Sequence, residues 1–316
     1  MRLRYLVLAA LLPLASCGAG DGSKDGDGDG KKGKKSSSEA SSGATSPATA
    51  ASDACTVAQA SQPLPDDVRE SSGVAASRTH SGVFWTHNDS GDPIVVAVNA
   101  TGARAGAVQV TNARVEDWED IAIAPCPSGG DCLYVADIGD NQAKRTSVTV
   151  WRFPEPGPTD AQSRPADELR FTYPDGPQDA EALFVLPDGT IHIITKGETG
   201  PVAVYRARGA AAGATTALER VRALNESQTS RKERITGAAA SADGQWVAVR
   251  TLRDVSFYRT AGLLGNEQPA HRMDLAALNE FQGEAVAFTG PGALLLTSEA
   301  GKKKDPATFA RLTCTL

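Results

Sequence analysis

One pattern recurs five times along this chain, and it constrains the fold more than any other feature of the sequence. Each copy has a short apolar run, a turn, a second apolar run and then a group of polar residues. One apolar position taken from each copy gives spacings of 47, 62, 55 and 48 residues. The five positions are Val74, Ile121, Leu183, Ala238 and Val286. Repeats of this length are typical of β-propellers, in which each unit forms one four-stranded blade.

The apolar runs are predicted to be strands rather than helices. They are short, rich in β-branched and aromatic residues, and bounded by Gly, Pro, Asp and Asn. Continuing from Val286 through the C-terminus, and on from Cys55 to Val74, takes another 50 residues, so the repeat closes in five steps. We therefore predict an all-β chain that forms a five-bladed β-propeller. A six-bladed ring with a degenerate unit within residues 154–179 is the alternative.

The fifth unit shows only three strands, so the ring needs a strand from elsewhere. Residues 55–59 at the start of the folded region are the candidate, and the N-terminal strand would then close the propeller. A disulfide between Cys55 and Cys314 would fasten that seam. Cys126 and Cys132 flank a turn-like insert and form the second predicted pair. A zinc site built of the four cysteines is disfavoured because no Cys-x-x-Cys is present.

The N-terminus predicts export and lipidation. Residues 1–16 combine Arg2 and Arg4 with an apolar run that is too short to span a bilayer, as in a signal peptide. The following Cys17 ends a Leu-Ala-Ser-Cys sequence that resembles a bacterial lipobox, so Cys17 is the predicted lipidation site. An ordinary secretory signal with an incidental cysteine is the alternative. Residues 17–54 then form a Gly-, Ser- and Lys-rich disordered tether, and residues 55–316 form the propeller domain.

Compartment and partners follow from these features. We expect an extracytoplasmic protein that is held at the cell membrane by its lipid, in a compartment where disulfides form. The formal net charge of -6 argues against nucleic acid as a partner, because binding to phosphates requires a basic surface. We also expect a monomer.

Several phrases resemble a group of secreted β-propeller lipoproteins that is common in actinobacteria. The resemblance covers the chain from about Glu70 to the C-terminus and rests on the phrases Trp85-Thr86-His87-Asn88-Asp89-Ser90-Gly91, Asp117-Trp118-Glu119-Asp120-Ile121-Ala122 and Asp137-Ile138-Gly139-Asp140-Asn141. The group is similar, more distantly, to the phytase-like esterase propellers. The resemblance implies the propeller fold and little about activity.

Polar residues occur at two matching places in the repeat. The innermost strand of a propeller blade runs along the central channel, and the second strand returns antiparallel, so its end lies beside the start of the first. First-strand starts carry Ser72, Glu119, Glu181, Thr236 and Glu284. Second-strand ends carry Asn88, Asp89, Asp137, Asp140, Asn141, Lys196, Glu198, Arg250 and Glu299. We expect all of them at one mouth of the channel, where convergent polar groups indicate a site.

Three interpretations of this mouth remain open. Calcium binding is the first, since hard cations prefer oxygen ligands; the candidates are Glu119, Asp137, Asp140, Asn141, Glu181 and Glu284. Metal-dependent hydrolysis is the second, with His87, Lys196 and Arg250 as weak catalytic candidates. In the third, the charges neutralise one another around a wet channel. The carboxylates lie in different units, without the local spacing that makes a metal motif specific.

Function is therefore predicted only as a class. The sequence contains no Gly-x-Ser-x-Gly, no His-Glu-x-x-His and no glycine-rich phosphate loop. The leading interpretation is a lipid-anchored binding or scaffolding module at the cell envelope, which takes an unidentified small molecule or protein at the channel mouth. The alternative is a calcium-dependent hydrolase of phosphoesters or esters acting at the same mouth.

Overall fold

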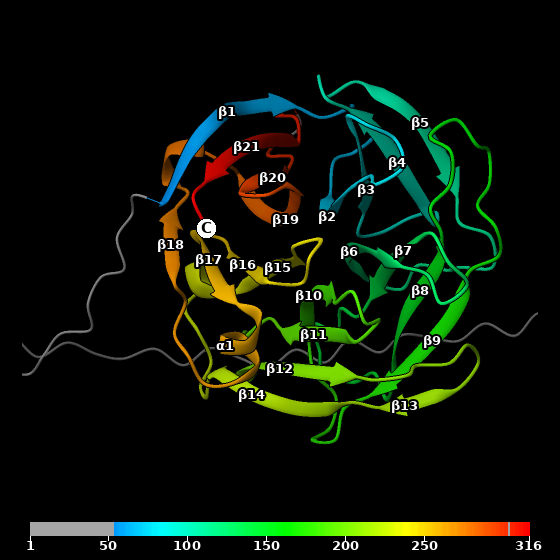
Figure 1. Ribbon diagram of the computed structural model, residues 1–316, viewed down its shortest axis with the longest axis vertical. Helices are drawn as coiled ribbons and strands as arrows, with labels where there is room; N and C mark the ends of the chain where they lie inside the picture. The colour runs from blue at the N-terminus through cyan, green and yellow to red at the C-terminus, as the bar shows by residue number, and fades with distance from the viewer. Residues whose placement is uncertain (1–53, 303) are drawn as a thin grey trace, which may run out of the picture. The chain divides into compact units, whose positions relative to one another are not determined.

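The described residues fold as a five-bladed β-propeller, which confirms the predicted fold. The computed structural model describes residues 54–302 and 304–316. Five sheets are arranged in a ring, and the innermost strand of each sheet lies nearest the axis, which we call the channel (Figure 1). The predicted signal peptide, Cys17 and the tether up to residue 53 lie outside the described residues.

The blades follow the repeat of the sequence. Blade 1 contains β2 (Ser71–Ala76), β3 (Val83–Asn88), β4 (Ile94–Asn99) and β5 (Arg104–Gln109). Blade 2 contains β6 (Trp118–Pro125), β7 (Asp131–Asp137), β8 (Val148–Pro154) and β9 (Asp167–Thr172). Blade 3 contains β10 (Ala180–Val185), β11 (Ile191–Thr195), β12 (Val202–Ala207) and β14 (Glu219–Asn225). Blade 4 contains β15 (Ile235–Ala240), β16 (Trp246–Thr251), β17 (Asp254–Arg259) and β18 (His271–Asp274). Blade 5 contains β19 (Gln282–Gly290), β20 (Ala293–Glu299), β21 (Thr308–Cys314) and β1 (Cys55–Pro63).

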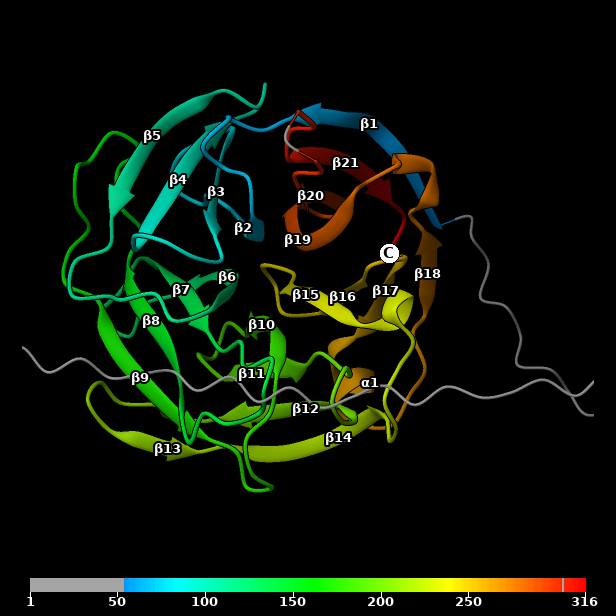
Figure 2. The ribbon, with the colours of Figure 1, turned by 180° about the vertical axis from the view of Figure 1, so that it is seen from behind.

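The ring is closed by strands from the two ends of the folded region. β1 pairs antiparallel with β21, and the two strands lie side by side in Figures 1 and 2. Cys55 lies opposite Cys314 in this register, and the two residues form a disulfide. Cys126 and Cys132 form the second disulfide, across the turn between β6 and β7. Both predicted disulfides and the closing strand are therefore confirmed.

The long second spacing of the repeat does not hide a sixth blade. Residues 154–179 contain β9, the outer strand of blade 2. A further strand, β13 (Thr215–Ala217), lies in the connection between β12 and β14 and pairs parallel with β9. The six-bladed alternative is therefore wrong, because the extra length builds and covers the edge of an existing blade.

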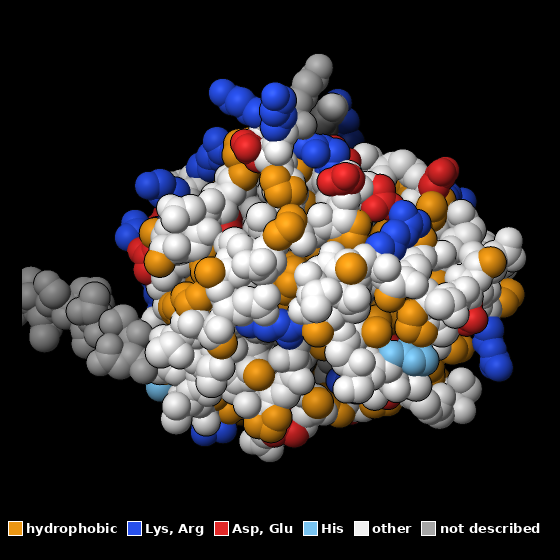
Figure 3. Space-filling model, turned by 90° about the horizontal axis from the view of Figure 1, so that it is seen from above, with side chains coloured by type: hydrophobic (Ala, Val, Ile, Leu, Met, Phe, Trp, Pro, Cys, Tyr) orange, Lys and Arg blue, Asp and Glu red, His pale blue; other side chains and the backbone are white. Residues whose placement is uncertain are grey.

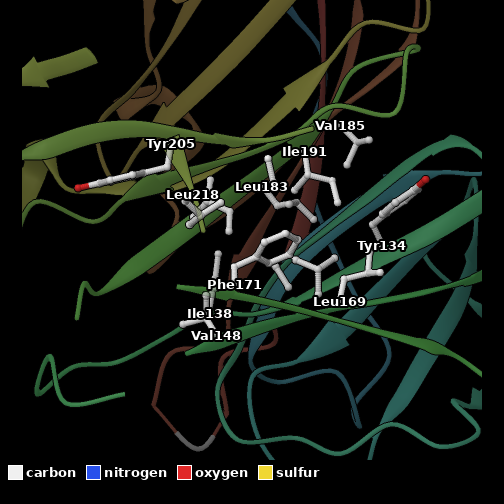
Figure 4. Close-up of a cluster of buried hydrophobic side chains, with 14 of the residues drawn as sticks. Tyr134, Ile138, Val148, Leu169, Phe171, Leu183, Val185, Ile191, Tyr205 and Leu218 are labelled. Carbon is white, nitrogen blue, oxygen red and sulfur yellow. The ribbon is translucent and has the colours of Figure 1, made fainter. Parts of the chain in front are cut away.

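The hydrophobic core lies between neighbouring blades. Figure 4 shows one of its clusters, in which Phe171 of blade 2 packs among side chains that include Leu183 and Ile191 of blade 3. Trp85 and Trp118 are fully buried in the cluster between blades 1 and 2. Their indole N–H groups donate to Glu155 Oε1 at 2.9 Å and to the Arg114 carbonyl at 3.0 Å. The bond of Trp85 thus joins blade 1 to blade 2, whereas the bond of Trp118 is local to the start of β6.

The inner strands approach one another closely, which explains their small residues. A Cβ atom at Gly73 would lie 2.5 Å from His87 Nε2 and 2.6 Å from the backbone nitrogen of Ile121. A Cβ atom at Gly237 would lie 2.8 Å from the carbonyl oxygen of Glu284, on the neighbouring inner strand. Glycine is required at both positions because any side chain would push two blades apart.

Helical structure is sparse. The described residues include the helix α1 (Thr260–Leu264) and the 3-10 turns η2 (Arg231–Glu233) and η3 (Ala276–Leu278). Within residues 54–302 and 304–316, no helix has the length and hydropathy of a membrane span. On the face shown in Figure 3, hydrophobic side chains occur singly or in small groups between polar ones.

Candidate functional site

Each inner strand contains the same irregularity near its start. The pairing of β6 with β7 skips from Trp118 to Asp120, so Glu119 is an extra residue opposite one register step of β7. The other inner strands show the same shift, which leaves Ser72, Glu181, Thr236 and Glu284 at the corresponding positions. Because β-bulges re-aim side chains and recur beside functional sites, the five repeated bulges mark one level of the channel.

The bulges create a ring of five polar side chains, which we call the bulge ring. It consists of Ser72, Glu119, Glu181, Thr236 and Glu284, and all five are buried. These are the residues that the sequence placed at first-strand starts. We call the end of the channel on which the ring opens the acidic end, because further carboxyl groups lie just outside it.

The carboxyl cluster of the acidic end comes from four blades. It consists of Asp89, Asp117, Glu119, Glu181, Glu284 and Glu299. Lys196, at the end of β11, supplies positive charge. Its Nζ atom pairs with Glu181 and lies 3.8 Å from Asp179 Oδ2 and 3.7 Å from Glu198 Oε2. One ammonium group is thus shared among several carboxylates.

Burial and mutual repulsion raise the pKa values of the cluster. The pKa of Glu119 is well above its usual range, first because of burial and then because of the charges on Glu181 and Asp117. Burial, and then the charges on Glu181 and Glu299, also raise the pKa of Glu284. Burial followed by neighbouring carboxylates raises the pKa of Asp89 and that of Glu299 to about 7. The acidic end therefore binds and releases protons near neutral pH.

Asp120, the residue after the bulge of β6, bonds to backbone groups of three inner strands. It is fully buried. Its Oδ1 atom accepts the N–H of Ile121 at 2.8 Å, and its Oδ2 atom accepts those of Leu183 at 2.8 Å and Ala238 at 3.2 Å. One carboxyl group thus joins the inner strands of blades 2, 3 and 4. In β6 it lies between Glu119 of the bulge ring and Ile121, which lines the cavity at the other end of the channel.

Half of the proposed calcium ligands serve another purpose. Asp137 accepts the N–H groups of Glu116 and Asp117, both at 3.1 Å, and Arg145 Nη1 at 2.9 Å. Asp140 accepts two N–H groups of its own loop, both at 2.6 Å. Asn141 is exposed and its Oδ1 atom lies 3.4 Å from Lys196 Nζ. Only Glu119, Glu181 and Glu284 of the set reach the ring.

The expectation of calcium finds no support in this geometry. In the part of the chain that the structure describes, no three His, Cys, Asp or Glu side chains are arranged to hold a metal ion. Asp137 and Asp140 already accept hydrogen bonds from loop N–H groups, and Glu181 already pairs with Lys196. The remaining carboxyl groups are spaced around a ring.

Two of the three weak catalytic candidates lie inside the wall of the propeller. His87 is fully buried and its ring meets that of Trp118 edge-on at 5.5 Å; burial lowers its pKa to about 4. Arg250 is also fully buried, where it pairs with Glu280 and donates to the carbonyls of Ala285 at 2.7 Å and Thr297 at 2.8 Å. Both residues connect blades, and only Lys196 borders the channel mouth.

An open cleft lies beside the cluster, between blades 1 and 5. Its volume is about 410 Å³, and Glu299 lines it together with Glu70 and Asn88. Asp66, Asp67 and Arg69 also line it. Glu299 therefore belongs both to the carboxyl cluster and to a space that is open to solvent, so a ligand group can reach the cluster there.

The sequence analysis did not predict several residues of the site. Asp120, Asp179 and Arg145 were not proposed as site residues, although Asp120 lies in the most conspicuous motif of the chain. Strand alternation predicts opposite directions for Glu119 and Asp120, and it does not allow for the bulge that brings both to the channel. The sequence does contain one signal for the bulge ring: a polar residue recurs two positions before each of the five apolar positions that define the repeat.

Comparison with known proteins supports the fold and nothing more specific. No family model matches the chain, and no curated protein matches its sequence. The PQQ-bound form of an aldose sugar dehydrogenase from Streptomyces coelicolor is similar over 83% of this chain and 98% of its own, with 12% identity and a TM-score of 0.51. A putative glucose dehydrogenase from Thermus thermophilus is similar over 80% of this chain and 99% of its own, with 10% identity and a TM-score of 0.46. At 12% identity the likeness to the Streptomyces structure concerns the fold alone.

Proposed function

We propose that this protein is a lipid-anchored binding module of the cell envelope, and that the acidic end of its channel takes a cationic group of a small molecule or a protein. The carboxyl cluster is the observation that carries the proposal. Buried like charges raise the free energy of the ligand-free site, and a bound cation would relieve that repulsion.

The shape of the acidic end suits such a ligand. The cleft of about 410 Å³ beside Glu299 admits a group from solvent, and Glu70 and Asn88 in its wall offer further oxygen acceptors. Lys196 remains bound to Glu181, so it compensates only one side of the ring. A primary or secondary amine, or a guanidinium group, donates hydrogen bonds to several carboxylates at once.

The position of the chain ends is consistent with an anchor at Cys17. The carbonyl of Ala54 accepts the N–H of Thr315 at 2.7 Å, beside the Cys55–Cys314 disulfide. β1 begins there and runs towards the acidic end, antiparallel to β21. The first described residues therefore lie at the end of the propeller opposite the carboxyl cluster.

Two enzymatic alternatives fit the residues less well. The hydrolase alternative needs a metal site and free cationic groups, whereas Lys196 is paired and Arg250 is buried. The PQQ of the Streptomyces structure is a polycarboxylate, and the carboxyl cluster would repel it. The residues of the acidic end therefore do not fit this cofactor.

Calorimetric titration with spermidine at low ionic strength tests the proposal. We expect saturable binding by the full chain, release of protons at pH 7, and weaker binding as salt is added. Glu299→Gln should weaken binding about tenfold, because it removes the carboxylate that faces the open cleft.

Glu226→Gln is the matched control. Glu226 is an exposed carboxylate after β14, far from the channel, and its replacement should change the dissociation constant less than about twofold. Absence of saturable binding, or equal binding by Glu299→Gln and the wild type, would contradict the proposal.

A further inference from the structure

We propose a second ligand site at the opposite end of the channel, which takes a neutral organic molecule with an apolar body and a few hydrogen-bonding oxygens. We call this the apolar end. A cavity of about 530 Å³ opens there, between the final residues of the inner strands. Cavities that bind small organic molecules have volumes of roughly 300–1,000 Å³.

The walls of the cavity are built from small aliphatic side chains. Every inner strand contributes, for example Ala75, Ala122, Val185, Ala239 and Ala287. Trp246 and Phe288 add aromatic surface, and Leu316 at the C-terminus borders the cavity. Small residues here leave space on the propeller axis, whereas larger ones would fill it.

The two charged side chains at the rim, Arg78 and Asp243, already have partners. Arg78 pairs with Asp131 at 2.9 Å. Asp243 accepts the hydroxyl of Ser241 at 2.6 Å and the N–H of Gln245 at 3.0 Å. These bonds hold the turns that surround the cavity. A charged ligand would have to break them, so the rim favours a neutral one.

Backbone groups supply the polar contacts. Each inner strand is the edge of its sheet, since β2, β6, β10, β15 and β19 pair with a neighbour on one side only. Such an edge carries N–H and C=O groups that no sheet partner uses. A ligand with carbonyl or hydroxyl oxygens can bond to these groups while its apolar body contacts the alanines.

The site is separate from the acidic end and independent of its proposed function. Asp120 spans blades 2, 3 and 4 between the two. The cavity contains none of the carboxyl cluster. Ligands at the two ends therefore differ in chemistry: a cation at one and a neutral apolar molecule at the other.

Fluorescence titration with N-phenyl-1-naphthylamine, a neutral apolar probe, tests the inference. The full chain carrying Cys17→Ser avoids an acyl group and the micelles it would need. We expect saturable binding of one probe per chain, with energy transfer from tryptophan and no dependence on salt. Ala240→Phe places a ring in the cavity wall and should weaken binding about tenfold or more.

A second pair of variants keeps the result interpretable if Ala240→Phe disturbs folding. Thr289 is exposed and lines the cavity, so Thr289→Trp should block the opening and weaken binding about tenfold. Thr215 is exposed on β13 at the outer rim, and Thr215→Trp is the matched control, which should change the affinity less than about twofold. Non-saturable binding, or equal affinity in Thr289→Trp and Thr215→Trp, would overturn the inference.

Discussion

The two ends of the propeller channel are built by the same five strands and yet have opposite chemistry. At the acidic end the inner strands begin with bulges that aim Glu119, Glu181 and Glu284 at the axis. At the apolar end four of the inner strands pair regularly, β19 has a second register shift between Phe288 and Gly290, and alanines surround a cavity of about 530 Å³. One extra residue per strand therefore separates a charged region from an apolar one.

The ends also differ in what holds them together. Both disulfides lie towards the apolar end, where β6 meets β7 and where β1 meets β21. The acidic end is held by ion pairs and hydrogen bonds, including those of Lys196 and Asp137. Redox conditions should therefore act on one end, and pH on the other.

Removing the seam disulfide should have the largest effect on stability. Cys55 and Cys314 are 259 residues apart, and a crosslink across so long a loop contributes about 5 kcal/mol in the chain-entropy model. The double variant Cys55→Ser/Cys314→Ser should lose stability of this order in denaturant-induced unfolding.

The second disulfide provides the matched comparison. Cys126 and Cys132 are separated by 6 residues, so the same model predicts a loss of about 2 kcal/mol for their double serine variant. A larger loss at this short loop than at the seam would show that closure of the ring contributes little.

Asp120→Ala tests the boundary between the two ends. It would leave three buried backbone N–H groups without their acceptor, which costs about 3 kcal/mol or more. Thermal and denaturant unfolding would measure the loss. Asp92→Ala, an exposed carboxylate between β3 and β4, should stay within about 0.5 kcal/mol of the wild type. A similar, small effect of both variants would mean that Asp120 does not join the blades.

These differences explain which features the sequence predicted. The repeat, the five blades and the strand that closes the ring could be predicted because strands and turns are recognisable from local sequence. The bulge ring was predicted as a set of positions because polar residues recur before each apolar run. Asp120 and β13 were missed, since their bonds join residues from different blades, such as Asp120 with Leu183 and Ala238. The apolar cavity was missed because small residues in strands are also typical of close packing.

The smallest effect concerns the pH dependence of the acidic end. Burial and the charge on Asp89 raise the pKa of Glu299 from 4.5 to about 7 in the folded chain. The folded state therefore binds a proton that the unfolded state releases between these values, so the contribution of Glu299 to stability is present below pH 4.5 and is lost as the pH rises through 7. Glu299→Gln removes this dependence.

We expect the free energy of unfolding of Glu299→Gln, relative to the wild type, to rise by about 1–2 kcal/mol between pH 4.5 and pH 8, after allowance for the partial exposure of Glu299. The relative measure is needed because buried His87 and His192, with pKa values lowered to about 4 by burial, act in the opposite direction on the wild-type curve. The free energy of unfolding of Glu226→Gln should differ from that of the wild type by the same amount at both pH values. A pH-independent difference for Glu299→Gln would mean that its carboxyl group is not strained by its neighbours, and the contrast between the two ends would then be one of shape rather than of charge.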